Sequence, residues 1–250
     1  MLPEYEIRKT ICEIGKRLYD KGYVAAKHGN ISYKYSENEY FCTPRGVSKV
    51  FLTPDKIVKV DANGKMIGNC MYEPTSEVTL HIRMYKENPE ICALIHAQPP
   101  FSTAYAIKNV PINNCVLPEN YVYLGVVPKG AYNKATGEIS AELVDCLRTK
   151  KGFLFEGTSV FSTGDTLENA FDNVDSLEFY SRMNFIGSHI PGGAGVVEAV
   201  SGNVGNGAVS EMILDFNGNR AGVKASENGV LGNEAIIKAV TEQIIRELGR

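Results

Sequence analysis

The sequence predicts a mixed α/β fold in which a β-sheet lies between layers of helices. Helical periodicities and short apolar runs both occur along the chain, and they are mixed without the strict alternation of a doubly wound nucleotide fold. The chain has 250 residues, of which 44% are hydrophobic, so it can bury a sizeable core as one domain. We therefore expect an α/β/α layered domain.

Turn and cap signals separate the expected elements. The first predicted helix has Pro3 in its first turn. Further helices are predicted to begin at Thr75, at Pro99-Pro100, at Ser140 and at a capping box spanning Asp165 to Glu168, and a last one carries Ile236, Val240, Ile244 and Leu248. Predicted strands cover Ile31–Tyr35, Tyr40–Thr43, Ile57–Val60, Ile91–Ile95, Val122–Val127, Phe153–Phe155, Val160–Phe161 and Met212–Phe216.

The composition changes near the C-terminal quarter of the chain. Residues 187–207 are rich in glycine, which is typical of a linker or a site loop. We expect one domain over residues 1–186, followed by residues 187–250 as a glycine-rich segment with a C-terminal strand and helix that pack on the same domain.

Charge and cysteine usage narrow the class of protein. A net charge of -3 and a pI near 5.9 give no electrostatic reason to expect a nucleic-acid or membrane partner. No apolar run approaches the roughly 20 residues that cross a bilayer, and the N-terminus lacks a signal-peptide pattern. The cysteines are widely spread without a C-x-x-C pair. We expect a cytoplasmic protein with a small-molecule substrate.

Three short polar segments could together bind an anion. Asn30 lies in a turn that enters a strand, and Gly46 lies in a turn that leaves one. Thr75 and Ser76 start a predicted helix, where unpaired backbone N–H groups suit phosphate. Taken singly, each of these residues is more simply a turn or cap residue.

A carboxylate and two histidines follow these segments. Glu77 lies in the first turn of the predicted helix, where a carboxylate often only complements the helix dipole. We interpret His81, one turn further on, as a packed histidine. His96 ends an apolar strand just before a proline pair, so we expect its ring to project from the rim of the sheet, where a metal ligand sits well.

Four motifs follow one another along the chain: Gly29-Asn30-x-Ser32, Thr43-Pro44-x-Gly46, Glu77-x-x-x-His81 and Leu94-Ile95-His96-x-x-Pro99-Pro100. Together and in this order they resemble one protein family, the class II aldolase/adducin family. Its members include fuculose- and rhamnulose-phosphate aldolases and the ribulose-phosphate 4-epimerase. The resemblance implies a central, mainly antiparallel sheet and a homotetramer with active sites between subunits.

The resemblance also implies roles for individual residues. The acid/base carboxylate of the family maps to Glu77, and a site tyrosine maps to Tyr121. The phosphate-binding positions map to Asn30, Gly46, Thr75 and Ser76. Three zinc-binding histidines of its aldolases map to His96, Gln98 and Glu156, so two of the three are replaced.

This altered set bears on the expected metal. Three imidazoles suit Zn²⁺, whereas one imidazole, an amide oxygen and a carboxylate suit Mn²⁺, Fe²⁺ or Mg²⁺ better. In the alternative interpretation, Gln98 and Glu156 hydrogen-bond each other or nearby backbone in a site that has lost its metal.

Two functions follow from the sequence. The first is a divalent-metal-dependent lyase of the retro-aldol type that acts on a small sugar phosphate or related hydroxy-ketone. Glu77 would move the proton, and Tyr121 would protonate the leaving aldehyde. The second is a non-catalytic, adducin-like binding or assembly module. Decarboxylation or epimerisation on the same scaffold shares the enolate chemistry and stays open.

Overall fold

The computed structural model describes residues 3–110, 112, 114–115, 127, 129–133, 138–149, 152–155, 159–190, 197–198, 211–216 and 219–224. The chain divides into two compact units, residues 1–111 with 127–181, and residues 112–126 with 182–250. Among the described residues, no helix is both long enough and apolar enough to span a membrane.

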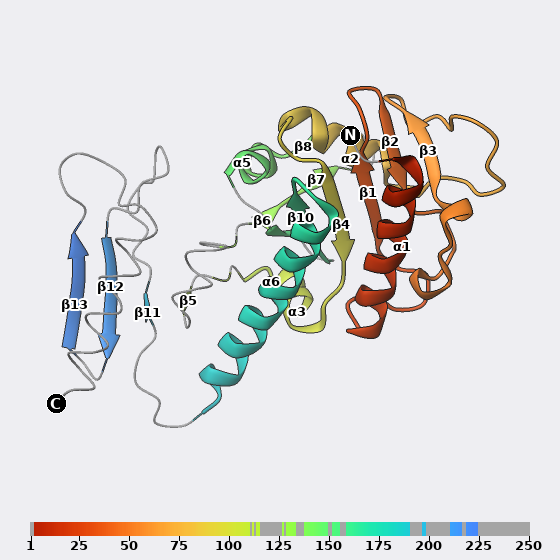
Figure 1. The fold of residues 1–250 in the computed structure, drawn as a ribbon. Helices are drawn as coiled ribbons and strands as arrows, with labels where there is room; N and C mark the ends of the chain where they lie inside the picture. The colour runs from red at the N-terminus through yellow and green to blue at the C-terminus, as the bar shows by residue number, and fades with distance from the viewer. Residues whose placement is uncertain are drawn as a thin grey trace. The chain divides into compact units, whose positions relative to one another are not determined.

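The first unit is built on a seven-stranded sheet with the order β3-β2-β1-β4-β10-β9-β6 (Figure 1). All neighbours in this sheet are antiparallel except β6 and β9, so the predicted mainly antiparallel sheet is confirmed. Its strands are β1 (Asn30–Lys34), β2 (Glu39–Cys42), β3 (Val58–Asp61), β4 (Ala93–Ala97), β6 (Lys129–Gly130), β9 (Gly152–Phe155) and β10 (Ser159–Gly164).

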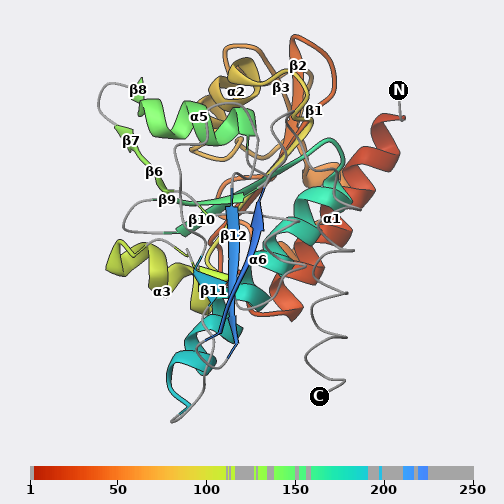
Figure 2. The same cartoon turned by 90° about the vertical axis from the view of Figure 1, so that its left-hand side faces the viewer.

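Helices cover both faces of this sheet, which confirms the predicted α/β/α layers (Figure 2). α1 (Glu4–Asp20) and α6 (Leu167–Ser188) lie on one face, and α2 (Val78–Glu87) and α5 (Ala141–Thr149) lie on the other. α3 (Pro100–Lys108) follows β4, and the short 3-10 helices η1 (Lys49–Phe51) and η2 (Pro54–Lys56) connect β2 to β3.

The helical periodicity of α1 explains its place in the fold. Ile7, Ile11, Ile14 and Leu18 are at most 2% exposed, because a spacing of three to four residues puts them on one face of the helix. They pack on Ile31 and Ile95 of the central strands. Burial of each such side chain stabilises the fold by about 1.5–3 kcal/mol.

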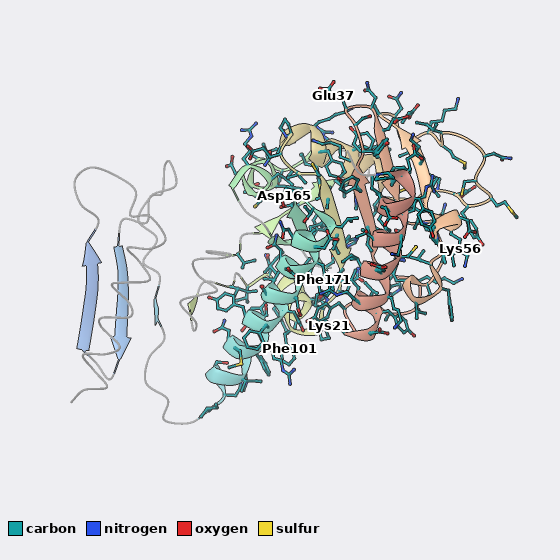
Figure 3. The ribbon with its side chains drawn as sticks, in the orientation of Figure 1. Lys21, Glu37, Lys56, Phe101, Asp165 and Phe171 are labelled. Atoms are coloured by element: carbon teal, nitrogen blue, oxygen red, sulfur yellow. The ribbon has the colours of Figure 1, made fainter. Side chains whose placement is uncertain are left out.

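α6 begins one residue later than the predicted capping box implies. Thr166 Oγ1 accepts a hydrogen bond from Asn169 N at 3.1 Å, whereas Asp165 accepts from the side-chain amide of Asn169 at 2.7 Å. Figure 3 shows Asp165 before the helix and Phe171 on it, and Arg17 of α1 lies 3.8 Å from the Phe171 ring centroid. The predicted apolar face is fully buried and comprises Leu167, Phe171, Val174 and Leu177.

The described parts of the second unit are the last residues of α6, from Arg182, and short strand pairs. β5 (Asn114–Cys115) pairs with β11 (Val197–Glu198), and β12 (Glu211–Phe216) pairs with β13 (Asn219–Lys224). A separate pair in the first unit joins β7 (Tyr132–Asn133) to β8 (Glu138–Ile139). The predicted C-terminal helix and all but Val127 of the predicted strand Val122–Val127 lie outside the described residues. The division into residues 1–186 and 187–250 stays a prediction.

A polar network is buried between the sheet and α2. Ser32 Oγ lies 2.7 Å from His81 Nδ1 and 2.7 Å from the Tyr85 hydroxyl. His81 is fully buried, as the sequence indicated, and its Nε2 lacks a hydrogen-bond partner among the described residues. Burial lowers the pKa of His81 from 6.5 to about 4, because a charged ring here would lose its hydration.

We expect His81 to make the fold sensitive to acid. The unfolded chain takes up a proton at this imidazole as the pH falls through 6.5, whereas the folded chain does so only near pH 4. The contribution is therefore fully present above pH 6.5 and is lost as the pH falls towards 4, by about 3 kcal/mol in all. Urea unfolding between pH 4 and 7 measures it. His81→Gln, which cannot titrate, should flatten this slope, and an unchanged slope would contradict the assignment.

Candidate functional site

The register of the central strands brings three side chains into one row. Asn30 of β1 lies opposite His96 of β4, and Phe161 of β10 lies opposite His96 on the other side. The His96 and Phe161 rings stack with 4.4 Å between centroids and 3° between planes. The imidazole is therefore held in one plane by its neighbour on the sheet.

The position of His96 corrects the sequence prediction. β4 covers Ala93–Ala97 and not Ile91–Ile95, because an Asx turn occupies the preceding residues. In that turn Asn88 accepts hydrogen bonds from Glu90 N at 3.0 Å and from Ile91 N at 3.2 Å. His96 consequently lies between two paired strands, only 8% exposed, and does not project from the rim of the sheet.

Glu77 contacts His96 from the N-terminal end of α2. The helix begins at Val78, three residues after the predicted start at Thr75, and Glu77 is its N-cap residue without a side-chain cap hydrogen bond. Its Oε2 instead lies 2.5 Å from His96 Nδ1 and accepts from Asn30 Nδ2 at 2.6 Å. The carboxylate therefore joins the sheet to the helix layer and faces the row of strand side chains.

Opposing effects determine the charge of this carboxylate. Burial raises the pKa of Glu77, but the hydrogen bond and charge of His96 and the hydrogen bond from Asn30 lower it more, to about 2. Glu77 is thus ionised at neutral pH.

The second ring nitrogen of His96 faces residues that follow β4 and begin β10. His96 Nε2 lies 2.7 Å from Ser159 Oγ and 3.5 Å from Gln98 Nε2. Gln98 Oε1 is buried and lacks a hydrogen-bond partner among the described residues. A buried carbonyl oxygen without a partner is unfavourable, and a cation or a substrate hydroxyl would satisfy it.

A buried carboxylate on α6 fixes the chain directly after Gln98. Glu178 is 5% exposed and accepts hydrogen bonds from Phe101 N at 2.9 Å, Ser102 N at 2.8 Å and Ser102 Oγ at 2.7 Å. It satisfies N–H groups that the first turn of α3 would leave unpaired. Because Gln98 N also donates to Tyr23 O at 2.8 Å, Gln98 is held from both sides.

The turn after β2 and the segment before α2 are joined by backbone hydrogen bonds. Arg45 N donates to Glu73 O at 2.9 Å, and Thr75 N donates to Thr43 O at 3.1 Å. Thr75 and Ser76 therefore precede the helix and do not form its first turn, contrary to the prediction. The pairing holds Thr75 beside the turn after β2, and Thr75 O accepts from Val78 N at 3.2 Å in a separate turn that leads into α2.

The described residues with predicted site roles all line one pocket. Lys27, His28 and Arg45 add basic side chains to its lining, and Arg45 has a solvent-exposed ion-pair contact with Glu73 at 4.0 Å. The predicted residues Tyr121 and Glu156 lie outside the described residues. The predicted residues in the pocket lining are Asn30, Gly46, Thr75, Ser76, Glu77, His96 and Gln98.

The residues present fit a hard divalent cation better than zinc. Among the described residues, no group of three His, Cys, Asp or Glu side chains converges as a metal site. Two predicted metal ligands lie among the described residues, the His96 imidazole and the buried, unsatisfied Gln98 oxygen. The third, Glu156, lies outside them. A set with one nitrogen and two oxygen donors suits Mn²⁺ or Mg²⁺.

A family model describing the class II aldolase and adducin N-terminal domain matches residues 9–185. The chain belongs to this family. The resemblance seen in the sequence motifs is thereby confirmed.

Relatives with assigned activities include a decarboxylase and an aldolase. A 3-oxo-tetronate 4-phosphate decarboxylase of Haemophilus influenzae is 30% identical over 183 residues, which cover 71% of this chain and 86% of the relative. An L-fuculose phosphate aldolase of Methanocaldococcus jannaschii is 28% identical over 179 residues, which cover 72% of this chain and 96% of the relative.

Solved structures show the same fold. An L-fuculose 1-phosphate aldolase matches with a TM-score of 0.66 at 17% identity and covers 96% of each chain. The L-fuculose-1-phosphate aldolase of Thermus thermophilus matches with a TM-score of 0.62 at 24% identity, over 72% of this chain and 94% of the other. The predicted class II aldolase-like fold is confirmed.

Three contributors to the site were missed in the sequence. Ser159 contacts His96, Glu178 holds the start of α3, and Lys49 donates to a carbonyl of a site loop. Ser159 and Glu178 are remote in sequence from their partners, and no motif marked them. Glu178 alone had a signal, because a charged residue directly follows Leu177 on the buried face of α6.

We expect the two glycines of the pocket to differ in their tolerance of a side chain. Both have positive φ, +71° at Gly29 and +75° at Gly46. A Cβ at Gly46 would meet open space, so Gly46→Ala should destabilise the fold by about 1–2 kcal/mol through backbone strain alone. A Cβ at Gly29 would lie 2.8 Å from His96 O and 2.5 Å from Val24 Cγ1. Gly29→Ala should therefore be clearly more destabilising in urea unfolding, and equal effects would contradict this geometry.

Proposed function

We propose that this protein is a divalent-cation-dependent lyase that cleaves a carbon–carbon bond next to a carbonyl group in a small sugar phosphate or related hydroxy-ketone. One observation carries the proposal. An ionised, largely buried carboxylate, Glu77, lies between His96 and Asn30 in the same pocket as an uncharged set of hydroxyl, amide and backbone groups suited to phosphate. Proton transfer and anion binding can therefore act on one small molecule.

Residues on two sides of the pocket would bind the substrate. Asn30, Gly46, Thr75 and Ser76 would surround the phosphate, and the basic side chains of the pocket lining would attract it. A divalent cation, held by His96, Gln98 and, outside the described residues, Glu156, would supply Lewis-acid polarisation of the substrate carbonyl.

Glu77 is the proposed proton carrier. In a retro-aldol reaction a base removes the hydroxyl proton, the carbon–carbon bond breaks, and the electron pair stays on the carbonyl-bearing fragment as an enolate. A proton then returns to that carbon. Glu77 would perform one or both transfers. Tyr121 would lie at the aldehyde oxygen and would take up the hydroxyl proton in cleavage or return it in the reverse, condensation direction.

Decarboxylation is the second candidate, and the similarity to the Haemophilus influenzae relative favours it. Loss of carbon dioxide from a 3-oxo acid leaves the same kind of enolate, so only the return of a proton is needed. Parallel assays distinguish the two reactions. One measures release of aldehyde from phosphorylated hydroxy-ketones, and the other measures release of carbon dioxide from phosphorylated 3-oxo acids.

The assembly and location of the protein stay predictions. We propose a cytoplasmic homotetramer with active sites between subunits, as the family resemblance implies. Light scattering of the purified protein measures the assembly, and a monomeric mass would contradict it.

Glu77→Gln should lower kcat by about 10²–10⁴-fold, because the amide cannot accept the transferred proton. The fold should stay intact, since Gln preserves the size of the side chain. Glu73→Gln is the matched control, because Glu73 is an exposed carboxylate four residues away, and it should keep full activity. Full activity of Glu77→Gln would refute the role of Glu77.

Protein purified without chelator should contain about one equivalent of Mn²⁺, Fe²⁺, Mg²⁺ or Zn²⁺ per chain, and His96→Ala should lose it. Metal analysis by mass spectrometry measures both. In a thermal-shift assay the cation and inorganic phosphate together should raise Tm, since ligands that bind the native state stabilise it. If the protein neither contains nor takes up metal, and Tm does not rise with the cation and phosphate, the result would instead support an adducin-like binding module.

A further inference from the structure

Lys49 is a buried lysine that the proposed chemistry does not use. It lies in η1 and is 2% exposed. Burial lowers the pKa of its ammonium group to about 8, and among the described residues no carboxylate lies within ion-pair distance of it. Burying an unpaired ammonium is unfavourable, so the contacts that it does make must explain its place.

The ammonium group joins two loops of the pocket. Lys49 Nζ donates to Val47 O at 3.1 Å and to Lys27 O at 3.4 Å. Val47 directly follows the turn that contains Gly46, and Lys27 belongs to the loop that leads into Asn30. Each loop thus contains one predicted phosphate-binding residue. Each loop also has one backbone carbonyl that accepts a hydrogen bond from the Lys49 ammonium group.

The backbone of Lys49 is seated on a rigid element. Gly15 of α1 lies so close that a Cβ at this position would be 3.3 Å from Lys49 O and 3.5 Å from Lys49 Cβ. Gly15 is buried on the same face of α1 as Ile11 and Leu18, so η1 packs directly on a helix that belongs to the core. The side chain therefore extends from a fixed base to the two loops.

We propose that Lys49 is the positioning residue of the anion pocket, and that its ammonium group holds the Asn30 loop and the Gly46 loop at the separation that a phosphate group requires. This inference rests on the proposed phosphate site. The positive charge of Lys49 also favours binding of an anion between the two loops, which explains why an ammonium group occupies this position. Lys49 does not touch the substrate, so it should affect binding and not the chemical step.

Lys49→Met tests the proposal, because methionine preserves much of the volume but cannot donate a hydrogen bond. Titration calorimetry with inorganic phosphate at pH 7 should show at least fivefold weaker binding. Tm should be unchanged or higher, since an unpaired buried charge has been removed. A merely structural lysine would give the opposite pattern, a lower Tm with unchanged phosphate affinity.

Hydrogen exchange reports directly on the loops. His28 N donates to Ala25 O at 2.9 Å, and Arg45 N donates to Glu73 O at 2.9 Å, so both amides are protected reporters. Both should exchange faster in Lys49→Met, while amides of α1 should not change. Lys56→Met is the matched control, because Lys56 also donates to a backbone carbonyl, Phe51 O at 2.6 Å, but is not among the residues that line the pocket. Figure 3 shows Lys56 at the edge of the first unit.

The outcomes separate this inference from the function on which it rests. If the unaltered protein does not bind phosphate, the phosphate site fails and the inference fails with it. If it binds phosphate and Lys49→Met binds within twofold of it, only the inference fails. Weaker binding with unchanged exchange in both loops also overturns it. Should Lys49→Met not fold, Lys49→Gln is measured against the same criteria.

Discussion

The hydrogen bond between Glu77 and His96, 2.5 Å long, is the interaction on which the site depends. It joins the N-terminus of α2 to the centre of the sheet, in a place where neither group has much water. Charge-assisted hydrogen bonds are strong under such conditions, and the loss of either partner leaves the other buried and unsatisfied. The same bond explains both the ionised state of Glu77 and the absence of a conventional side-chain cap on α2.

Much of the site follows from backbone geometry that is fixed before any side chain acts. The register of β1, β4 and β10 sets Asn30, His96 and Phe161 in one row, and two backbone hydrogen bonds set the Gly46 turn beside Thr75. Because antiparallel register is imposed by a buried face, a slip of one residue would turn His96 to the opposite side of the sheet. The apolar residues of the core therefore determine where the polar residues meet.

The sequence was sufficient for the layers, the mainly antiparallel sheet and most residues of the pocket, because these depend on periodicity and on motifs of short span. The sequence did not predict correctly where some helices and strands begin. The Asx turn at Asn88 and the pairing of Thr75 with Thr43 displaced the starts of β4 and α2. It also failed for Ser159 and Glu178, which lie 63 and 76 residues from the partners that they contact. Local patterns carry no information about such contacts.

The stacking of His96 on Phe161 has a spectroscopic consequence. Protons that lie over the face of an aromatic ring are shielded by its ring current, and the two rings are nearly parallel at 4.4 Å. The carbon-bound protons of His96 should therefore resonate upfield of those of the exposed His28. The chain has only four histidines, so this signal can be assigned without difficulty. Because His96 lines the pocket, its proton resonances report ligand binding there in nuclear magnetic resonance spectra.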